Sequence, residues 1–260
     1  MAYENLLYEV RDGIARVTIN RPKVLNALND QTIRELYHCF TVVGTDANVL
    51  GVILTGAGDK AFIAGADIQE LSKVGPIDGK NKSLLGQGVL NLIETVGKPV
   101  VAAVNGFALG GGMELALACT LRTASKTARM GLPEVTLGII PGYGGTQRLA
   151  RIAGPGVARE WVLTGDMYSA EEAYRVGVVN RLYEPAELLP KTEELLKTIL
   201  SRGPVALRFA MEVIHRGMET SLMEGQKIEA DLFGLVSTTT DMKEGMQAFL
   251  EKRKPKFTGK

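Results

Sequence analysis

Two segments of the chain share one pattern, in which a buried strand leads through a glycine turn into a helix. The first reads VILTGAGDKAFIAGADIQEL over residues 52–71, and the second reads VVAAVNGFALGGGMELAL over residues 100–117. Each begins with a continuous apolar run of strand length and has glycine before a set of helix-forming residues. Repetition of such a ββα unit winds a sheet into a spiral rather than a flat doubly wound sheet. The sequence therefore predicts an α/β fold built from ββα units.

The pattern changes to helices alone near residue 195. Strand signals are absent after Pro185, and helices are expected at 186–202, 204–217, 220–234 and 241–252. Apolar residues recur at helical spacing here, which indicates packing on the core or on another subunit. We therefore predict a ββα core at 1–195 and a separate C-terminal helical region at 196–260.

Turn and cap signals divide the rest of the core. Leu6–Val10 and Ile14–Ile19 alternate on either side of Arg11-Asp12-Gly13, which predicts a β-hairpin. Asp30 is the expected N-cap of a helix with an apolar face. Residues 75–82 are expected to form a loop, and Val178–Tyr183 a last strand.

Composition excludes several classes of function. Thirty Lys and Arg against 29 Asp and Glu leave a net charge of +1, so no nucleic-acid partner is expected. The two cysteines and two histidines are too few for a disulfide framework or a Cys/His metal site, so no metal is expected. No apolar run reaches transmembrane length and the start lacks a signal-peptide pattern, so a cytoplasmic protein without membrane contact is expected.

Glu114 is the only charged residue between Phe107 and Cys119. A carboxylate in such apolar surroundings neutralises, finds partners or takes part in chemistry. Gly110, Gly111 and Gly112 precede it, and glycines leave the backbone open to close approach by a ligand. The plainer alternative is a close-packed turn whose acid favours the N-terminus of the helix.

A second acid, Glu134, follows Pro133 at the head of another predicted helical turn with apolar neighbours. Two carboxylates in a partly dry cleft divide their pKa values, so that one can give a proton while the other takes one. The glycine turns at Gly65 and Gly111 offer backbone N–H groups suited to an oxyanion hole. Together these features fit addition or loss of water next to a carbonyl through an enolate.

Five segments resemble the crotonase, or enoyl-CoA hydratase, superfamily over nearly the whole chain. They are AFIAGADIQEL (61–71), PVVAAVNGFALGGGMELALAC (99–119), GLPEVTLGIIPGYGGTQRLARIAG (131–154), LTGDMYSAEEAYRVGVVNRL (163–182) and EGMQAFLEKRKPKF (244–257). The resemblance implies a ClpP/crotonase-like spiral of ββα units with a C-terminal α-helical trimerisation region. It also implies a homo-oligomer, a trimer or a hexamer made as a dimer of trimers.

The resemblance assigns roles to individual residues. It implies that Ala66 and Gly111 supply the oxyanion-hole N–H groups, and that Glu114 and Glu134 are the acid/base pair. It places Ala64, Ala66, Asp67, Ile68 and Gly111 at the acyl-CoA substrate. CoA is part of the substrate, so no separate cofactor is expected. Retention of both acids favours an enoyl-CoA hydratase, a carbon–oxygen lyase of lipid metabolism.

Two positions depart from the family pattern. Thr120 stands where aspartate is common, and Leu132 stands where a polar residue is common. Leu132 is expected to alter the pocket wall beside Glu134, which leaves the preferred acyl chain open.

Three alternatives accompany this interpretation. One is an enoyl-CoA isomerase or another acyl-CoA reaction of the same family, and another is a non-enzymatic RNA-binding member. The third is a nicotinamide-dependent dehydrogenase, because Gly56–Ala61 matches G-x-G-x-x-A after a strand. The segment that follows, AFIAG, does not open a helix as that fingerprint requires.

Overall fold

The structure is a computed structural model that describes residues 3–260. The chain divides into two units, Met1–Glu193 and Glu194–Lys260. The first unit holds all the strands of the described chain, and the second is helical.

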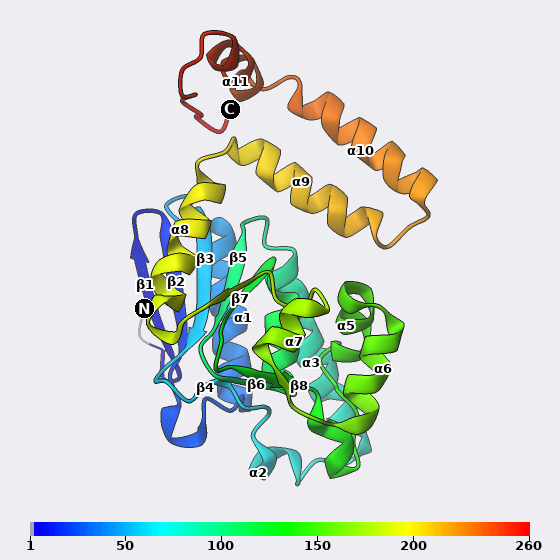
Figure 1. Cartoon of the computed structure of the whole chain (residues 1–260). Helices are drawn as coiled ribbons and strands as arrows, with labels where there is room; N and C mark the ends of the chain where they lie inside the picture. Colours follow the sequence, from blue (N-terminus) through cyan, green and yellow to red (C-terminus); the bar gives the residue numbers. More distant parts are fainter. Residues whose placement is uncertain (1–2) are drawn as a thin grey trace. The chain divides into compact units, whose positions relative to one another are not determined.

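Two sheets form the frame of the first unit (Figure 1). The larger sheet has six strands in the order β1 (Leu6–Arg11), β2 (Ile14–Ile19), β3 (Gly51–Gly56), β5 (Val100–Val104), β7 (Leu121–Ser125), β10 (Arg181–Tyr183). The β1–β2 hairpin is antiparallel as expected, and every other pair in this sheet is parallel. The smaller sheet has the order β4 (Ala61–Ile63), β6 (Phe107–Leu109), β8 (Arg129–Gly131), β9 (Tyr168–Ser169).

The predicted ββα repeat is confirmed. Each repeat places its first strand in the larger sheet and its second strand in the smaller one, as in β3 with β4 and β5 with β6. A third pair, β7 with β8, follows the same rule. Because successive repeats add parallel neighbours to both sheets, the chain winds as a spiral.

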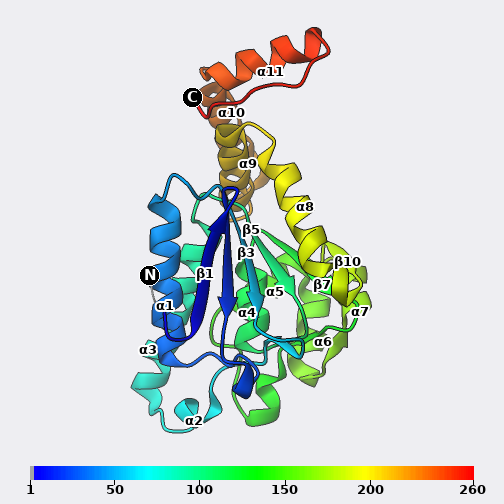
Figure 2. The same ribbon diagram turned by 90° about the vertical axis from the view of Figure 1, so that its left-hand side faces the viewer.

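Helices cover this frame and connect its strands. They are α1 (Asp30–Thr45), α2 (Ile68–Leu71), α3 (Pro76–Glu94), α4 (Gly111–Ala118), α5 (Gly145–Ala153), α6 (Pro155–Thr164) and α7 (Ala170–Arg175). Short 3-10 turns occur at η1 (Pro22–Val24), η2 (Pro133–Leu137) and η3 (Pro185–Glu187). Figure 2 shows α1 and α3 along the same side of the larger sheet.

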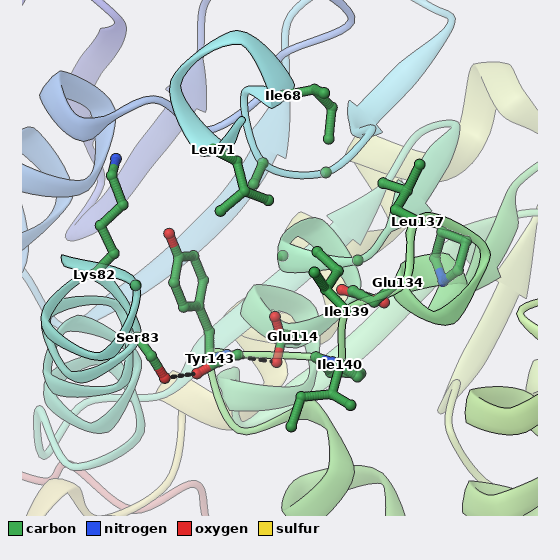
Figure 3. Close-up of a pocket in the computed structure, with 18 of the residues that line it drawn as sticks. Ile68, Leu71, Lys82, Ser83, Glu114, Glu134, Leu137, Ile139, Ile140 and Tyr143 are labelled. Carbon is green, nitrogen blue, oxygen red and sulfur yellow. Dashed lines mark hydrogen bonds between the residues drawn. The ribbon is translucent and has the colours of Figure 1, made fainter. Parts of the chain in front are cut away.

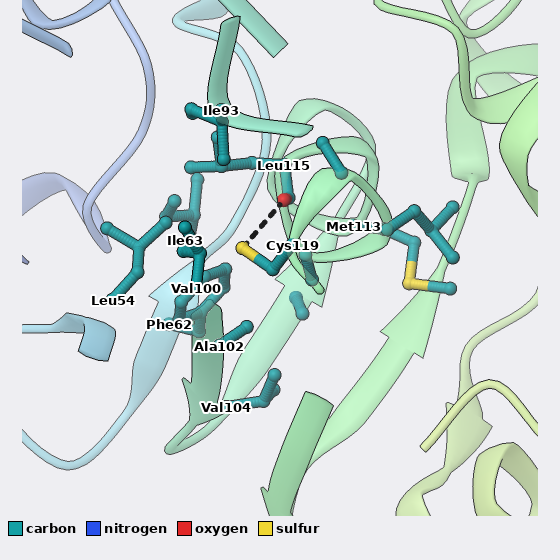
Figure 4. Packing of buried hydrophobic residues seen from close by; sticks show 14 of the residues in the cluster. Leu54, Phe62, Ile63, Ile93, Val100, Ala102, Val104, Met113, Leu115 and Cys119 are labelled. Atoms are coloured by element: carbon teal, nitrogen blue, oxygen red, sulfur yellow. Dashed lines mark hydrogen bonds between the residues drawn. The ribbon is translucent and has the colours of Figure 1, made fainter. Parts of the chain in front are cut away.

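The core fills the space between α4 and the two sheets (Figure 4). Leu115 of α4, Phe62 of β4 and Ala102 of β5 are fully buried there. Cys119 ends α4, and its thiol donates to the carbonyl oxygen of Leu115 at 3.4 Å. Because α4 is apolar on all sides, this packing fixes the helix that carries Glu114.

Three local predictions were wrong. Residues 76–82 are the start of α3 rather than a loop, because Pro76 stands at the first helical position, where proline is well suited. Asn29 rather than Asp30 caps α1, since its side chain accepts from the amide of Thr32. The last strand is confined to Arg181–Tyr183.

The glycine-rich turn after β3 leads into a strand. β3 ends at Gly56, and the next element is β4, which begins at Ala61. A dinucleotide fingerprint requires a helix at this point, so the structure removes the basis for the dehydrogenase alternative.

The second unit is helical, as predicted. Its helices are the end of α8 (Leu188–Leu200), then α9 (Pro204–Gly217), α10 (Leu222–Val236) and α11 (Thr240–Leu250). Within this unit Asp241 accepts from the amides of Thr258 and Gly259 at 2.7 and 2.8 Å, which holds the C-terminal segment to α11. Across residues 3–260, no helix is both long enough and apolar enough to cross a membrane.

Gly112 tests the packing of α4 on β4. A Cβ added at Gly112 would lie 2.1 Å from the carbonyl oxygen of Ile63, so Gly112→Ala must displace α4. We expect a loss of about 1–3 kcal/mol in the free energy of unfolding, measured by urea denaturation. Gly88→Ala is the matched control, because Gly88 is an exposed α3 glycine with no atom within 4 Å of its added Cβ. It should be neutral or stabilise by about 0.5–1 kcal/mol. Equal stability of the two variants would contradict this account of the packing.

Candidate active site

A cavity of about 840 Å³ opens between the glycine turns and the loop that precedes α5. Its walls come from residues 64–66, α2, α3, the start of α4, η2 and the loop 138–143. Ile68, Leu71 and Tyr143 line it with apolar surface, while Glu114 and Glu134 point into it from different elements (Figure 3). Such a mostly apolar cavity with a few converging polar groups is typical of a small-molecule site.

Glu114 lies in the first turn of α4 and is 2 % exposed. Its Oε1 accepts hydrogen bonds from the amides of Tyr143 and Gly145, both at 2.7 Å. Burial raises the pKa of Glu114, while these two amides and the nearby charge of Arg148 oppose the rise. The fold therefore supplies partners that favour the charged form of this buried acid.

Glu134 lies in η2 directly after Pro133, and 9 % of it is exposed. Its Oε2 is buried without a hydrogen-bond partner in the described chain. Burial raises the pKa of Glu134 to about 7, and repulsion from Glu114 adds to the rise. Only the backbone N–H of Glu134 itself opposes this rise. The two acids thus differ in surroundings, because Glu114 accepts from two loop amides while Oε2 of Glu134 has no partner in the described chain.

Two glycines make room for the two carboxyl groups. A Cβ at Gly110 would lie 2.8 Å from Oε1 of Glu134, and Gly110 has φ +50°. A Cβ at Gly145 would lie 2.8 Å from Cγ of Glu114 and 3.0 Å from its Oε1. These positions therefore need glycine because a carboxyl group occupies the space of a side chain.

Ala66 and Gly111 line the cavity beside the acids. Leu28 forms a parallel β-bridge with Ala66, in which it donates to the carbonyl of Gly65 and accepts from the amide of Asp67. The N–H of Ala66 takes part in neither of these hydrogen bonds. Gly111 is the first residue of α4, where a helix leaves its N–H groups without partners in the helix. Within residues 3–260 neither N–H donates to another protein group.

The other predicted binding residues divide into two groups. Ala64 and Ile68 line the cavity, whereas Asp67 is not among its lining residues. The Asp67 carboxylate caps α2 through the amide of Gln69 and pairs with Arg21 at 3.2 Å. Its side chain therefore orders the turn that presents Ala66.

The loop before α5 contributes groups that the sequence interpretation missed. Tyr143 gives a backbone N–H to Glu114 and a ring that packs over Gly86, where an added Cβ would lie 2.2 Å from the ring. Gly145 gives the second N–H. The sequence feature that points to these groups is the segment GYGG before α5, since paired glycines at the start of a helix indicate close approach to another group.

The two departures from the family pattern lie away from the cavity lining. Leu132 is fully buried, and its Cδ2 would lie 3.1 Å from a Cβ added at Gly145. The Thr120 hydroxyl accepts from the amide of Val100 at 3.0 Å. Leu132 therefore does not line the cavity itself, because its side chain packs in the core. In the part of the chain that the structure describes, no cluster of three or more His, Cys, Asp or Glu is arranged to hold a metal ion.

Comparisons with known proteins agree with the fold. The family model for enoyl-CoA hydratase/isomerase matches residues 9–260. A crotonyl-CoA hydratase of Syntrophomonas wolfei is 49% identical over 260 residues, with 100% of both chains covered. A short-chain-enoyl-CoA hydratase of Clostridium acetobutylicum is 46% identical, with 98% of this chain and 97% of the relative covered. The crystal structure of an enoyl-CoA hydratase from Bacillus anthracis superposes with a TM-score of 0.95 at 40% identity, covering 99% and 100% of the chains.

The raised pKa of Glu134 predicts a pH-dependent effect of Glu134→Gln on stability. Glu134 titrates near 7 in the folded protein against an ordinary value of 4.5, so the folded state binds more protons between these values. The contribution of protonated Glu134 to the free energy of unfolding is therefore lost as the pH rises from 4.5 through about 7. Gln cannot ionise, so the Tm of E134Q relative to wild type should rise by several degrees between pH 5 and pH 8. A calorimetric Tm difference that stays constant over this range would contradict the assignment.

Proposed function

The chain belongs to the enoyl-CoA hydratase/isomerase family, and from this premise we propose that it is an enoyl-CoA hydratase. The reaction is the reversible addition of water to a trans-2-enoyl-CoA, giving a 3-hydroxyacyl-CoA. The observation that carries the proposal is the pair of buried acids, Glu114 and Glu134, at one cavity beside two available N–H groups. The two relatives named above favour a short acyl chain.

The different surroundings of the two acids support different roles. Glu114, with two amides on its Oε1, is suited to the ionised form and takes a proton from the attacking water. Glu134, whose pKa is raised to about 7, is suited to carry the proton that reaches Cα. The water oxygen bonds to Cβ and the carbon–carbon double bond becomes single. Glu114 ends protonated and Glu134 ionised, and exchange of one proton each with solvent returns both acids to their starting states.

The N–H groups of Ala66 and Gly111 are suited to the thioester oxygen of the substrate. Negative charge develops on this oxygen when water adds to Cβ and an enolate forms. Two preorganised N–H donors stabilise such charge, with each donor contributing on the order of 3 kcal/mol in comparable sites. Ala64 and Ile68 line the same cavity and are proposed to contact the CoA portion.

No separate cofactor has a role in this reaction, because proton transfer and oxyanion stabilisation use side chains and backbone alone. Asp67 is proposed to act only by ordering the turn, since its carboxylate is engaged with Arg21 and the amide of Gln69. The expected cytoplasmic location and the expected absence of nucleic-acid and membrane partners stay predictions.

Oligomerisation through the C-terminal helices is part of the proposal. Large apolar side chains on α10 and α11 are exposed in the single chain, including Leu222 at 79%, Phe233 at 71% and Phe249 at 82%. Exposed apolar surface of this kind marks protein interfaces. A homo-oligomer, a trimer or a dimer of trimers, buries such surface.

Substitution of either acid tests the chemistry. We expect Glu114→Gln and Glu134→Gln each to lower kcat for crotonyl-CoA hydration by about 10²–10⁴-fold, because a positioned acid or base contributes that much. Turnover is followed by the loss of enoyl-thioester absorbance, and circular dichroism checks the fold. Glu35→Gln is the matched control, since Glu35 is also buried but binds the amides of Glu4 and Asn5. Near-wild-type kcat in both site variants would rule out the two-carboxylate mechanism.

Light scattering tests the assembly. A homo-oligomer should give a mass of three or six times the 28.0 kDa chain. The double variant Phe233→Glu with Phe249→Glu should give a lower mass, because charge in an apolar interface is costly. A monomeric wild-type protein would refute the proposed assembly.

A further inference from the structure

The two peptide groups that donate to Glu114 are held at their carbonyl ends as well. The N–H of Tyr143 shares its peptide group with the carbonyl of Gly142, which accepts from Ser83 Oγ at 2.5 Å and Gln87 Nε2 at 3.0 Å. The N–H of Gly145 shares its peptide group with the carbonyl of Gly144. That carbonyl accepts from the α5 amides of Gln147 and Arg148 at 3.1 and 2.9 Å.

The peptide between them is held by the side chain of Arg148. Its Nη1 donates to the carbonyl oxygen of Tyr143 at 3.0 Å. Its other nitrogens reach α3, where Nε donates to Glu94 Oε2 at 2.9 Å and Nη2 donates to Asn91 Oδ1 at 2.6 Å. The guanidinium thus ties the loop to α3 with a fork of donors that a lysine cannot reproduce.

Gly144 leaves space for this contact. Its φ is +98°, a conformation that favours glycine, and an added Cβ would lie 2.6 Å from Nη1 of Arg148. The second glycine, Gly145, leaves space for Glu114 itself. The two adjacent glycines therefore leave room for two different groups, Gly144 for the guanidinium of Arg148 and Gly145 for the carboxylate of Glu114.

We infer that Arg148 is a positioning residue for Glu114, acting through the loop 143–145. The inference rests on the proposed function, in which Glu114 is the base that receives the proton of water. Arg148 is not among the residues that line the cavity, and only 11% of its side chain is exposed. Its effect on the reaction is therefore exerted through the carbonyl of Tyr143 and through its positive charge.

The charged and titratable groups around Glu114 are few. They are Arg148 of α5, Glu134 of η2, Tyr143 of the loop, and Lys82 and Glu94 of α3. The strands β4 and β6 that pack against α4 contain no titratable residue. Arg148 is the one whose charge acts to lower the pKa of Glu114 against the rise caused by burial. Loss of this charge should raise the pKa of Glu114 further.

Substitutions at Arg148 separate the effect of its positive charge from the effect of its forked set of hydrogen bonds. We expect Arg148→Gln to lower kcat by about 10–100-fold, as expected when a reacting group is misplaced by about 1 Å, with KM within about twofold. The acidic limb of its kcat–pH profile should move to higher pH, because a base with a raised pKa is ionised only at higher pH. Arg148→Lys keeps the charge but not the fork, so its limb should stay near the wild-type position while kcat falls.

Arg151→Gln is the matched control, because Arg151 is exposed on the same helix and its Nη1 donates to Gln147. It should leave kcat and the pH profile unchanged. A kcat of R148Q within twofold of wild type, with the acidic limb unmoved, overturns the inference. If R148Q does not fold, the variants Asn91→Ala and R148K test the inference instead. Both keep the positive charge at position 148 and remove part of its hydrogen bonding to α3. A wild-type kcat in both variants overturns the inference.

A readout independent of turnover separates this inference from the proposed function. The Glu114 carboxyl can be titrated by ¹³C NMR, with its signal assigned by comparison with E114Q. A wild-type protein without hydratase activity refutes the proposed function alone. A Glu114 titration that is identical in wild type and R148Q overturns the inference whatever the activity.

Discussion

The hydrogen bonds from Tyr143 and Gly145 to Glu114 are the contacts on which the candidate site depends. Burying a carboxylate in an apolar core costs several kcal/mol unless the charge is given partners. Glu114 is 2 % exposed on a helix that is otherwise apolar, and its own helix offers nothing to its Oε1. The partners come from a loop about thirty residues further along the chain. The site is therefore assembled only when α4 and this loop are packed together.

This dependence explains where the glycines fall. Gly110 and Gly145 are close to the carboxyl groups of Glu134 and Glu114, and Gly144 is close to the guanidinium of Arg148. At each of these positions a polar side-chain atom occupies the volume that a Cβ would need. The glycines of the site therefore report the location of charged groups, as well as permitting positive φ at Gly110 and Gly144.

The sequence predicted the parts of the molecule whose signals are local. Continuous apolar strands, glycine turns and a charged residue in an apolar run predicted the ββα repeat and brought Glu114, Glu134 and Gly111 forward as candidates. The family resemblance added Ala66. These four residues line one cavity. The start of α3 was missed because its first turns are polar and contain Gly79, so helical periodicity is weak there. Asp67 looked like a ligand contact, but its role as an α2 cap and partner of Arg21 depends on a residue 46 positions away.

The glycines of GYGG indicate a close approach in this loop, but the sequence does not predict that the loop amides donate to Glu114. A backbone N–H has no side-chain signature, so its direction follows only from how the loop is held. Here Ser83, Gln87 and Arg148 hold it at successive carbonyls, and two of these side chains come from α3, far earlier in the sequence. Glu134 receives no amide from such a loop, only its own backbone N–H, and its Oε2 is buried without a partner in the described chain. Because two loop amides donate to Glu114 and no loop amide donates to Glu134, two residues of the same type are suited to different proton-transfer roles.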